Sequence, residues 1–214
     1  MSVNWTVDGR PVVAVFIAEP GRGRWLAQVQ VQGVAELASA CVLRCENGPH
    51  EWHGSIAKQS NYQGFTEATI LGCPSLESTV PAAGYKNTTS KIVAREAVEA
   101  AGGTLDPSSN AWASLPFWAR KAATLADSLN ALCVTTGETW RVMRDGRVFV
   151  GTPAYAESKT EGVETDRDMQ LGCIHYVSDT PDLAPWLTVD GNKLHSVEHT
   201  ISDSVHLARA FLAQ

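Results

Sequence analysis

The sequence predicts an α+β fold in which short β-strands stand on either side of a segment of two helices. Three patterns carry this prediction. Residues 12–72 form short extended runs rich in β-branched and aromatic side chains, with Gly or Pro between the runs. Residues 91–101 place apolar side chains at three- and four-residue steps, as an amphipathic helix does. Asp145-Gly146 joins two short apolar runs, which is the strongest hairpin signal in the chain.

Residues 1–73 are expected to form an N-terminal β-domain. Its strand-like runs are residues 12–18, 25–31, 40–46, 50–59 and 65–71. In the second run, Ala27, Val29 and Val31 alternate with Gln28 and Gln30. Because successive side chains of a strand point to opposite faces, this alternation indicates a strand with one face toward water.

The composition changes after this domain. Residues 74–90 are rich in Pro, Ser, Thr, Ala and Gly without periodicity, which predicts a linker or long loop. Residues 91–134 are expected to be the helical segment. Its first helix ends at Gly102-Gly103, where glycine suits the left-handed conformation that follows many helices.

A second helix is predicted to begin near Pro116, since proline suits the first turn of a helix. Phe117, Leu125, Leu129 and Leu132 form its apolar face, and it ends before Gly137.

Residues 135–214 are expected to form a C-terminal β-rich part. It opens with the hairpin over residues 139–151. Further strand-like pieces follow at residues 171–177, 186–189 and 193–201, and a short helix is predicted at residues 204–213.

Composition and charge exclude several classes of protein. The 214 residues are 44% hydrophobic and 19% charged, which is typical of a soluble globular chain with a core in one domain or two small ones. Lys and Arg number 17 against 23 Asp and Glu, a net charge of −6, so no basic surplus favours stable nucleic-acid binding. The longest apolar run, residues 12–18, is too short for a membrane span, which needs roughly 20 residues. Five irregularly spaced cysteines fit synthesis in a reducing compartment.

One cluster has the side chains of a zinc site. Cys41, Cys45, His50 and His53 supply two thiols and two imidazoles, although their spacing is not a standard one. On a strand, Cys41 and Cys45 point the same way, so we interpret them as small apolar side chains facing a core. The sequence therefore predicts no metal and no cofactor.

A second cluster lies near the C-terminus. His195 and His199 share a face on either a helix or a strand, with His206, Glu198 and Asp203 nearby. No His-Glu-x-x-His motif accompanies them, so we interpret these histidines as structural.

No enzymatic signature is present in the sequence. The glycine-containing run at residues 19–24 lacks the Lys-Ser/Thr of a phosphate-binding loop and connects two strands, so we interpret it as a turn. No Gly-x-Ser-x-Gly nucleophile elbow occurs. Glu157 and Glu161 lie in a polar stretch that is typical of a solvated loop. The sequence thus predicts that the chain is not an enzyme.

Several segments, taken in their order, resemble one protein family. They are residues 52–57 and 65–72, residues 88–93 leading to Gly102-Gly103, and residues 123–132, 137–151 and 194–201. The stretch from 123 to 151 matches best, with a helix that ends at a glycine, a Trp-Arg strand and an Asp-Gly hairpin. The pattern resembles the baseplate hub proteins of contractile-tailed phages, the late-control family that includes the hub portion of type VI secretion spikes.

The resemblance implies small tube-like β-barrel or sandwich domains, two per subunit, in a homotrimeric ring that joins the tail tube to the central spike. It implies as partners a spike protein, a tail tube or tube-initiation protein, and a tape-measure protein, with the ring located in the tail baseplate after assembly in the host cytoplasm. Because this chain is short, the spike is expected to be a separate chain. The acidic balance further predicts a neutral or negative lumen, through which DNA or the tape-measure protein slides.

Two other functions remain open at this point. A hexameric distal-tail or tube-initiation protein would be present in six copies per tail. A tail-associated cell-wall hydrolase would be active on peptidoglycan.

Overall fold

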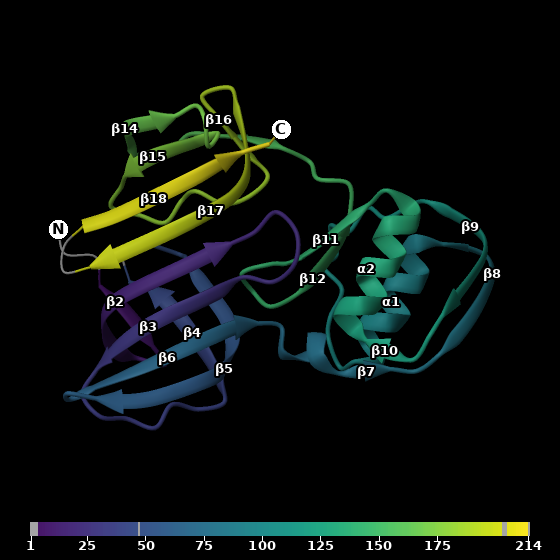
Figure 1. Ribbon diagram of the computed structural model, residues 1–214, viewed down its shortest axis with the longest axis horizontal. Coiled ribbons are helices and arrows are strands. Elements are labelled where there is room, and N and C mark those ends of the chain that lie inside the picture. The colour runs from purple at the N-terminus through teal and green to yellow at the C-terminus, as the bar shows by residue number, and fades with distance from the viewer. Residues whose placement is uncertain (1–3, 47, 203–204, 214) are drawn as a thin grey trace. The chain divides into compact units, whose positions relative to one another are not determined.

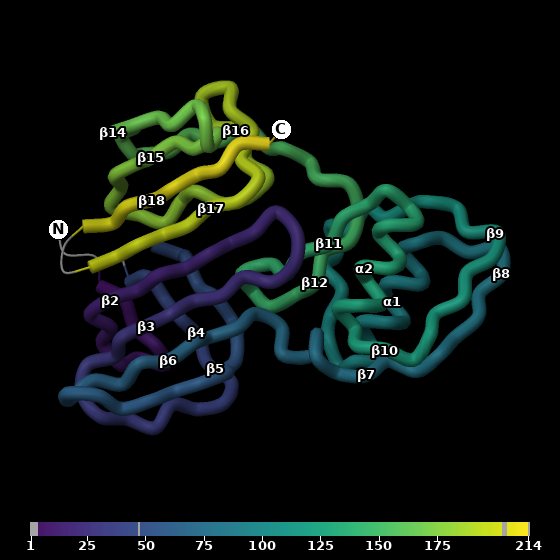
Figure 2. Tube along the Cα trace, in the orientation of Figure 1, coloured from purple at the N-terminus to yellow at the C-terminus, as the bar shows by residue number. Residues whose placement is uncertain are grey.

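A computed structural model of the chain describes residues 4–46, 48–202 and 205–213 (Figures 1 and 2). Within this part the chain is mostly β, with two α-helices, and this confirms the predicted α+β fold with a small β-barrel and an inserted two-helix segment. The chain folds into two compact units. The first comprises Met1–Gly21, Trp25–Gly72 and Ala154–Gln214, and the second comprises Arg22–Arg24 and Cys73–Pro153.

A closed barrel of six strands forms the first half of the first unit. The strands are β1 (Trp5–Val7), β2 (Arg10–Glu19), β3 (Leu26–Gln32), β4 (Ala40–Cys45), β5 (Glu51–Tyr62) and β6 (Phe65–Gly72). Their order is β1-β4-β5-β6-β3-β2, and pairing of β1 with β2 closes the barrel. All of these pairs are antiparallel. Because each strand pairs with two others, the barrel has no open edge along its closed part.

The barrel core follows the alternation in the sequence. On β3, Ala27, Val29 and Val31 are buried while Gln28 is exposed, which confirms the prediction of one dry and one wet face. Trp25 and Trp52 are among the largest fully buried side chains. The barrel is therefore a packed core and not a pore.

Six further strands form the second half of the first unit. They are β13 (Ala156–Ser158), β14 (Val163–Asp168), β15 (Cys173–Val177), β16 (Leu187–Val189), β17 (Asn192–Ser202) and β18 (Val205–Leu212). Their order is β13-β16-β17-β18-β15-β14, antiparallel except for the β13–β16 pair. β17 also pairs with β2, so the two halves share one continuous sheet.

The two halves repeat the same strand order, although β1 pairs with β4 antiparallel and β13 pairs with β16 parallel. Strands β1 to β6 can be matched in chain order with strands β13 to β18. Each pair of neighbouring strands in the first half then has a counterpart in the second half, except the pair β1–β2, which closes the barrel. The β5–β6 and β17–β18 hairpins also have matching register, because Tyr62 faces Phe65 as Ser202 faces Val205, and each hairpin has one irregularity further along. The first unit is thus built from two halves with the same strand order, of which the first is a closed barrel.

The predicted helix at residues 204–213 is wrong. This segment contains strand β18, in which His206, Ala208 and Ala210 are buried while Leu207 and Arg209 are exposed. The burial therefore has the period of two that a strand requires. Asp203, which was grouped with the nearby histidines, lies outside the described residues.

The second unit contains the two helices. Its elements are η1 (Pro74–Glu77), β7 (Thr79–Val80), β8 (Ala83–Thr89), α1 (Ser90–Ala100), β9 (Ser114–Arg120), β10 (Ala123–Thr124), α2 (Leu125–Thr136), β11 (Thr139–Val142) and β12 (Val148–Gly151). Helix α1 and the β11–β12 hairpin at Asp145-Gly146 confirm the corresponding predictions. No helix among the described residues is long and apolar enough to cross a membrane.

Three predictions about this part of the chain and its boundary are wrong. Pro116 does not begin a helix but lies within β9, which pairs with β8, and α2 begins at Leu125. A two-stranded ribbon has free edges on both sides, so it tolerates a residue without an N–H. The expected linker at residues 74–90 contains η1, β7 and β8. Residues 154–214, expected to form one C-terminal part with the hairpin, belong instead to the first unit.

Candidate functional site

An eight-stranded antiparallel sheet runs across both halves of the first unit. Its order is β5-β6-β3-β2-β17-β18-β15-β14, with four strands from each half and the β2–β17 pair at the junction. One face of this sheet covers the core of each half. The other face is open and is the candidate functional surface.

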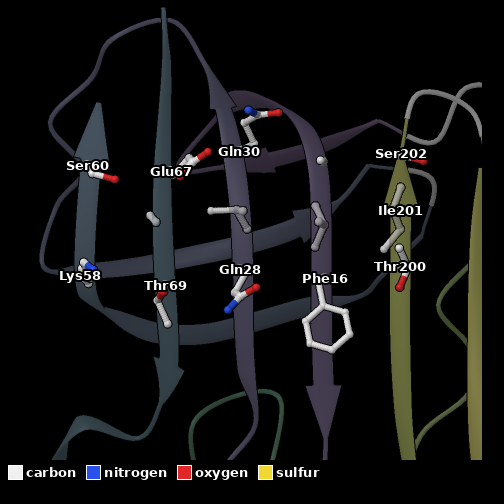
Figure 3. A pocket seen from close by; sticks show the side chains of 14 residues that line it. Phe16, Gln28, Gln30, Lys58, Ser60, Glu67, Thr69, Thr200, Ile201 and Ser202 are labelled. Atoms are coloured by element: carbon white, nitrogen blue, oxygen red, sulfur yellow. The ribbon is translucent and has the colours of Figure 1, made fainter. Parts of the chain in front are cut away.

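Cross-strand registers place one side chain of each strand in a single row across the open face. The row runs Lys58, Thr69, Gln28, Phe16, Thr200, Leu207, Val177 and Val163. Figure 3 shows its first five members side by side on neighbouring strands. Because directly opposed side chains on a sheet lie close together, this row makes a continuous surface.

The part of the open face over the barrel is polar and nearly neutral. It forms a groove lined by Gln28, Gln30, Ser60, Thr69 and Ser202, among others (Figure 3). Lys58 and Glu67 are the charged side chains of this groove and have opposite signs. Such a lining offers hydrogen-bonding groups without a strong field of either sign.

One end of the part over β18, β15 and β14 is apolar. Leu207, Val177 and Val163 follow one another in the row, with exposed fractions of 48%, 39% and 68%. Val205, two residues from Leu207 on the same strand face, is 46% exposed. Contiguous exposed apolar side chains of this kind mark a contact surface.

Both ends of the sheet are open. Among the described residues, β14 pairs only with β15, and the stretch of β5 from Lys58 to Tyr62 pairs only with β6. Val163 on β14 is 68% exposed, and Tyr62 at the end of β5 is 62% exposed. An open strand edge with exposed apolar side chains is a template for pairing with another chain.

The structure does not bring the zinc candidates together as a ligand set. Cys41 and Cys45 are buried in the barrel, whereas His53 is exposed with its Nε2 3.2 Å from Glu51 Oε2. His50 Nε2 lies 3.2 Å from Asp182 Oδ1. Burial, with a smaller effect of Asp8, raises the pKa of the Cys41 thiol to about 12, which disfavours the thiolate that a metal binds. The described residues contain no group of three or more His, Cys, Asp or Glu placed to hold a metal ion.

The C-terminal histidines separate into two environments. His199 and His206 are buried, with His199 Nδ1 3.0 Å from His206 Nε2, while His195 is exposed. Glu19 Oε1 is 3.5 Å from His199 Nε2 and is itself buried. The sequence could not predict this contact, because it depends on the pairing of β17 with β2.

Residues 22–24 of the glycine-containing turn bond to other residues of the second unit. The Gly23 N–H donates to the Trp140 carbonyl at 2.9 Å, and the Gly23 carbonyl accepts from the Val142 N–H at 2.8 Å. Arg22 donates to Asn130 and Arg24 pairs with Glu77. The polar groups that would cradle a phosphate are therefore engaged elsewhere.

Comparisons with solved structures identify the fold. No protein-family model and no curated protein sequence matches the chain. The 43 kDa tail protein of prophage MuSo2 from Shewanella oneidensis is similar with a TM-score of 0.69 and 10% identity, covering 99% of this chain and 97% of that one. A Neisseria meningitidis tail protein is similar with a TM-score of 0.67 and 12% identity, covering 100% and 97%.

A third similar structure is an E. coli component of the type VI secretion system, whose structure is described as similar to the T4 tail proteins gp27 and gp5. Its TM-score is 0.64 at 13% identity, covering 98% of this chain and 77% of that one. The chain thus has a fold found in phage tail proteins.

Proposed function

We propose that this protein is a structural subunit of a phage tail baseplate and forms a trimeric hub ring that joins the tail tube to a separate spike protein. The observation that carries the proposal is the eight-stranded sheet, which is built from two halves of like topology and is open at both ends. The fold shared with tail proteins supports the same role.

The repeated topology supports a trimer in particular. Three chains with two similar halves each supply six similar parts, which suits a tail tube of sixfold symmetry and a spike of threefold symmetry. Because the two ends of one sheet differ, contact between them is head-to-tail, and such contacts form a ring when the rotation from one copy to the next closes.

In this proposal the open face of the sheet lines the channel. At the registers traced across it, the cations are Lys58 and Arg209, and the anions are Glu67, Glu198, Asp166 and Asp168. This balance supports a lumen that lets DNA or a tape-measure protein pass without strong adhesion. Gln28→Arg, which adds a cation to this face, is expected to slow DNA ejection from assembled phage, whereas Gln28→Glu leaves it near the original rate.

The proposal is tested by mass and copy number. Light scattering of the purified chain, alone and with its spike, is expected to give a trimer, and purified tails are expected to hold three copies. Six copies per tail would identify a distal-tail or tube-initiation protein instead. A stable monomer at micromolar concentration, alone and with the spike, would reject the ring. Clearing of peptidoglycan in a zymogram would indicate a hydrolase.

A further inference from the structure

The junction between the two halves of one chain shows how one half meets the next. β17 uses its first residues to pair with β16, through Asn192 and Lys193, and its later residues to pair with β2. Its counterpart β5 likewise uses its first residues, through Ser55, to pair with β4. Its later residues, Lys58 to Tyr62, have β6 as their only strand neighbour among the described residues. β5 therefore has an open edge where β17 is paired with β2.

The other end of the sheet supplies the matching strand. β14 is the counterpart of β2, since it pairs with β15 as β2 pairs with β3. Matching the registers strand by strand makes Phe16 equivalent to Asp166 and Ala14 equivalent to Val163. On the side away from β3, β2 pairs with β17. On the corresponding side, away from β15, β14 has no strand beside it in the described part of the chain.

We propose that β14 of one copy pairs with the Lys58–Tyr62 edge of β5 in the next copy, in the register that β2 and β17 have within one chain. This inference rests on the proposed ring and names the contact that closes it. Its partner is a second copy of this chain.

The register of this contact is that of the junction between the two halves. Within the chain, Ala14 faces Ser202, Phe16 faces Thr200 and Ala18 faces Glu198. Carried to the equivalent strands, these pairs place Val163 opposite Tyr62, Asp166 opposite Ser60 and Asp168 opposite Lys58 of the next copy.

The side chains brought together in this way are complementary, although the register was derived from the backbone alone. Val163 and Tyr62 are 68% and 62% exposed in the single chain, so their contact removes apolar surface from water at both ends. Asp168 and Lys58 carry opposite charges. Opposite charges and apolar pairs at directly facing positions stabilise antiparallel strands, whereas a register shifted by one residue would not align either pair.

Disulfide cross-linking of the full chain tests this contact. In the Tyr62→Cys/Val163→Cys variant, mild oxidation is expected to link neighbouring copies and to give covalent species up to the trimer. The five native cysteines are buried, so they provide little background. The matched control is Tyr62→Cys/Thr200→Cys. It keeps the cysteine on β5 at one end of the sheet but places the second cysteine on β17 in the middle of the sheet, so its copies are expected to stay unlinked.

The outcomes separate this inference from the proposed function. A trimer by mass in which the Tyr62–Val163 pair does not cross-link would overturn the contact while leaving the ring intact. Cross-linked species larger than a trimer would support the contact and reject the threefold ring. A chain that neither assembles nor cross-links, alone or in tails, would reject both.

Charge reversal gives a second measurement. Lys58→Glu places two like charges opposite each other and is expected to raise the concentration needed for half-assembly several-fold. Adding Asp168→Asn removes one of these charges while keeping the side-chain oxygen that accepts from the Gln170 and Leu171 N–H groups, so assembly is expected to recover in part. An equal loss in the single and double variants would contradict the pairing of Lys58 with Asp168.

Discussion

His199 and His206 form a hydrogen bond between two buried imidazoles, with 3.0 Å between His199 Nδ1 and His206 Nε2. His199 Nε2 lies 3.1 Å from the Leu183 carbonyl oxygen, which can only accept, so this nitrogen carries the hydrogen. The contact joins β17, β18 and the segment before β16 at one point inside the second half. One pair of side chains therefore contacts three segments of the first unit.

His206→Ala is expected to destabilise the protein by about 1–3 kcal/mol, because it leaves the buried His199 Nδ1 without its partner. Urea denaturation measures this loss. His175→Ala, at a position that the register places on the open face of β15, is the control and is expected to cost less. Equal losses in the two variants would show that the buried bond adds nothing.

Gly72→Ala is expected to destabilise the barrel by about 1–3 kcal/mol, the usual range for overpacking a core. A Cβ at this position would lie 2.5 Å from Trp25 Nε1, and Trp25 is 1% exposed. Thermal unfolding followed by tryptophan fluorescence measures the change. Gly84→Ala, where a Cβ would meet no atom within 4 Å, is the control and is expected to be tolerated.

Thr124→Ala is expected to cost about 1 kcal/mol of stability, the typical loss of a helix N-cap. The Thr124 hydroxyl accepts from the Asp127 N–H at 3.1 Å at the start of α2. Chemical denaturation of the full chain measures the loss. Thr135→Ala removes an exposed hydroxyl from the same helix, and an equal effect there would refute the capping role.

The buried thiols are expected to make stability fall at high pH. Burial raises the pKa of Cys133 to about 12, and burial together with Asp8 does the same for Cys41. Since the unfolded thiols lose their protons near the ordinary value of 9.0, this contribution is complete below pH 9 and is lost as the pH rises toward 12.

Thiol alkylation checks this expectation. At pH 8 the native chain is expected to react far more slowly than the urea-unfolded chain, because the thiolate is the reactive form. Rapid labelling of Cys41 or Cys133 in the native protein would contradict the raised pKa values.

Local patterns in the sequence were sufficient where neighbouring residues decide the structure. The alternation of Ala27, Val29 and Val31 with glutamines predicts β3, the three- and four-residue steps predict α1, and Asp145-Gly146 predicts the hairpin. The same reasoning failed at Pro116 and at residues 204–213. In β18 the polar His206 is buried and Leu207 is exposed, so the usual relation between polarity and burial is inverted there.

The fold class, helix α1, the β11–β12 hairpin and the acidic charge balance follow from the residues themselves, whereas strands β8, β9 and β18 do not. The return of residues 154–214 beside the barrel and the shared strand order of the two halves become visible only in the folded chain. The reason is physical: side chains specify whether a strand has a dry face, but the backbone hydrogen bonds that pair β2 with β17 join distant segments and are the same for any residue. The open ends of the sheet, on which the proposed assembly depends, are visible only after those distant pairs have formed.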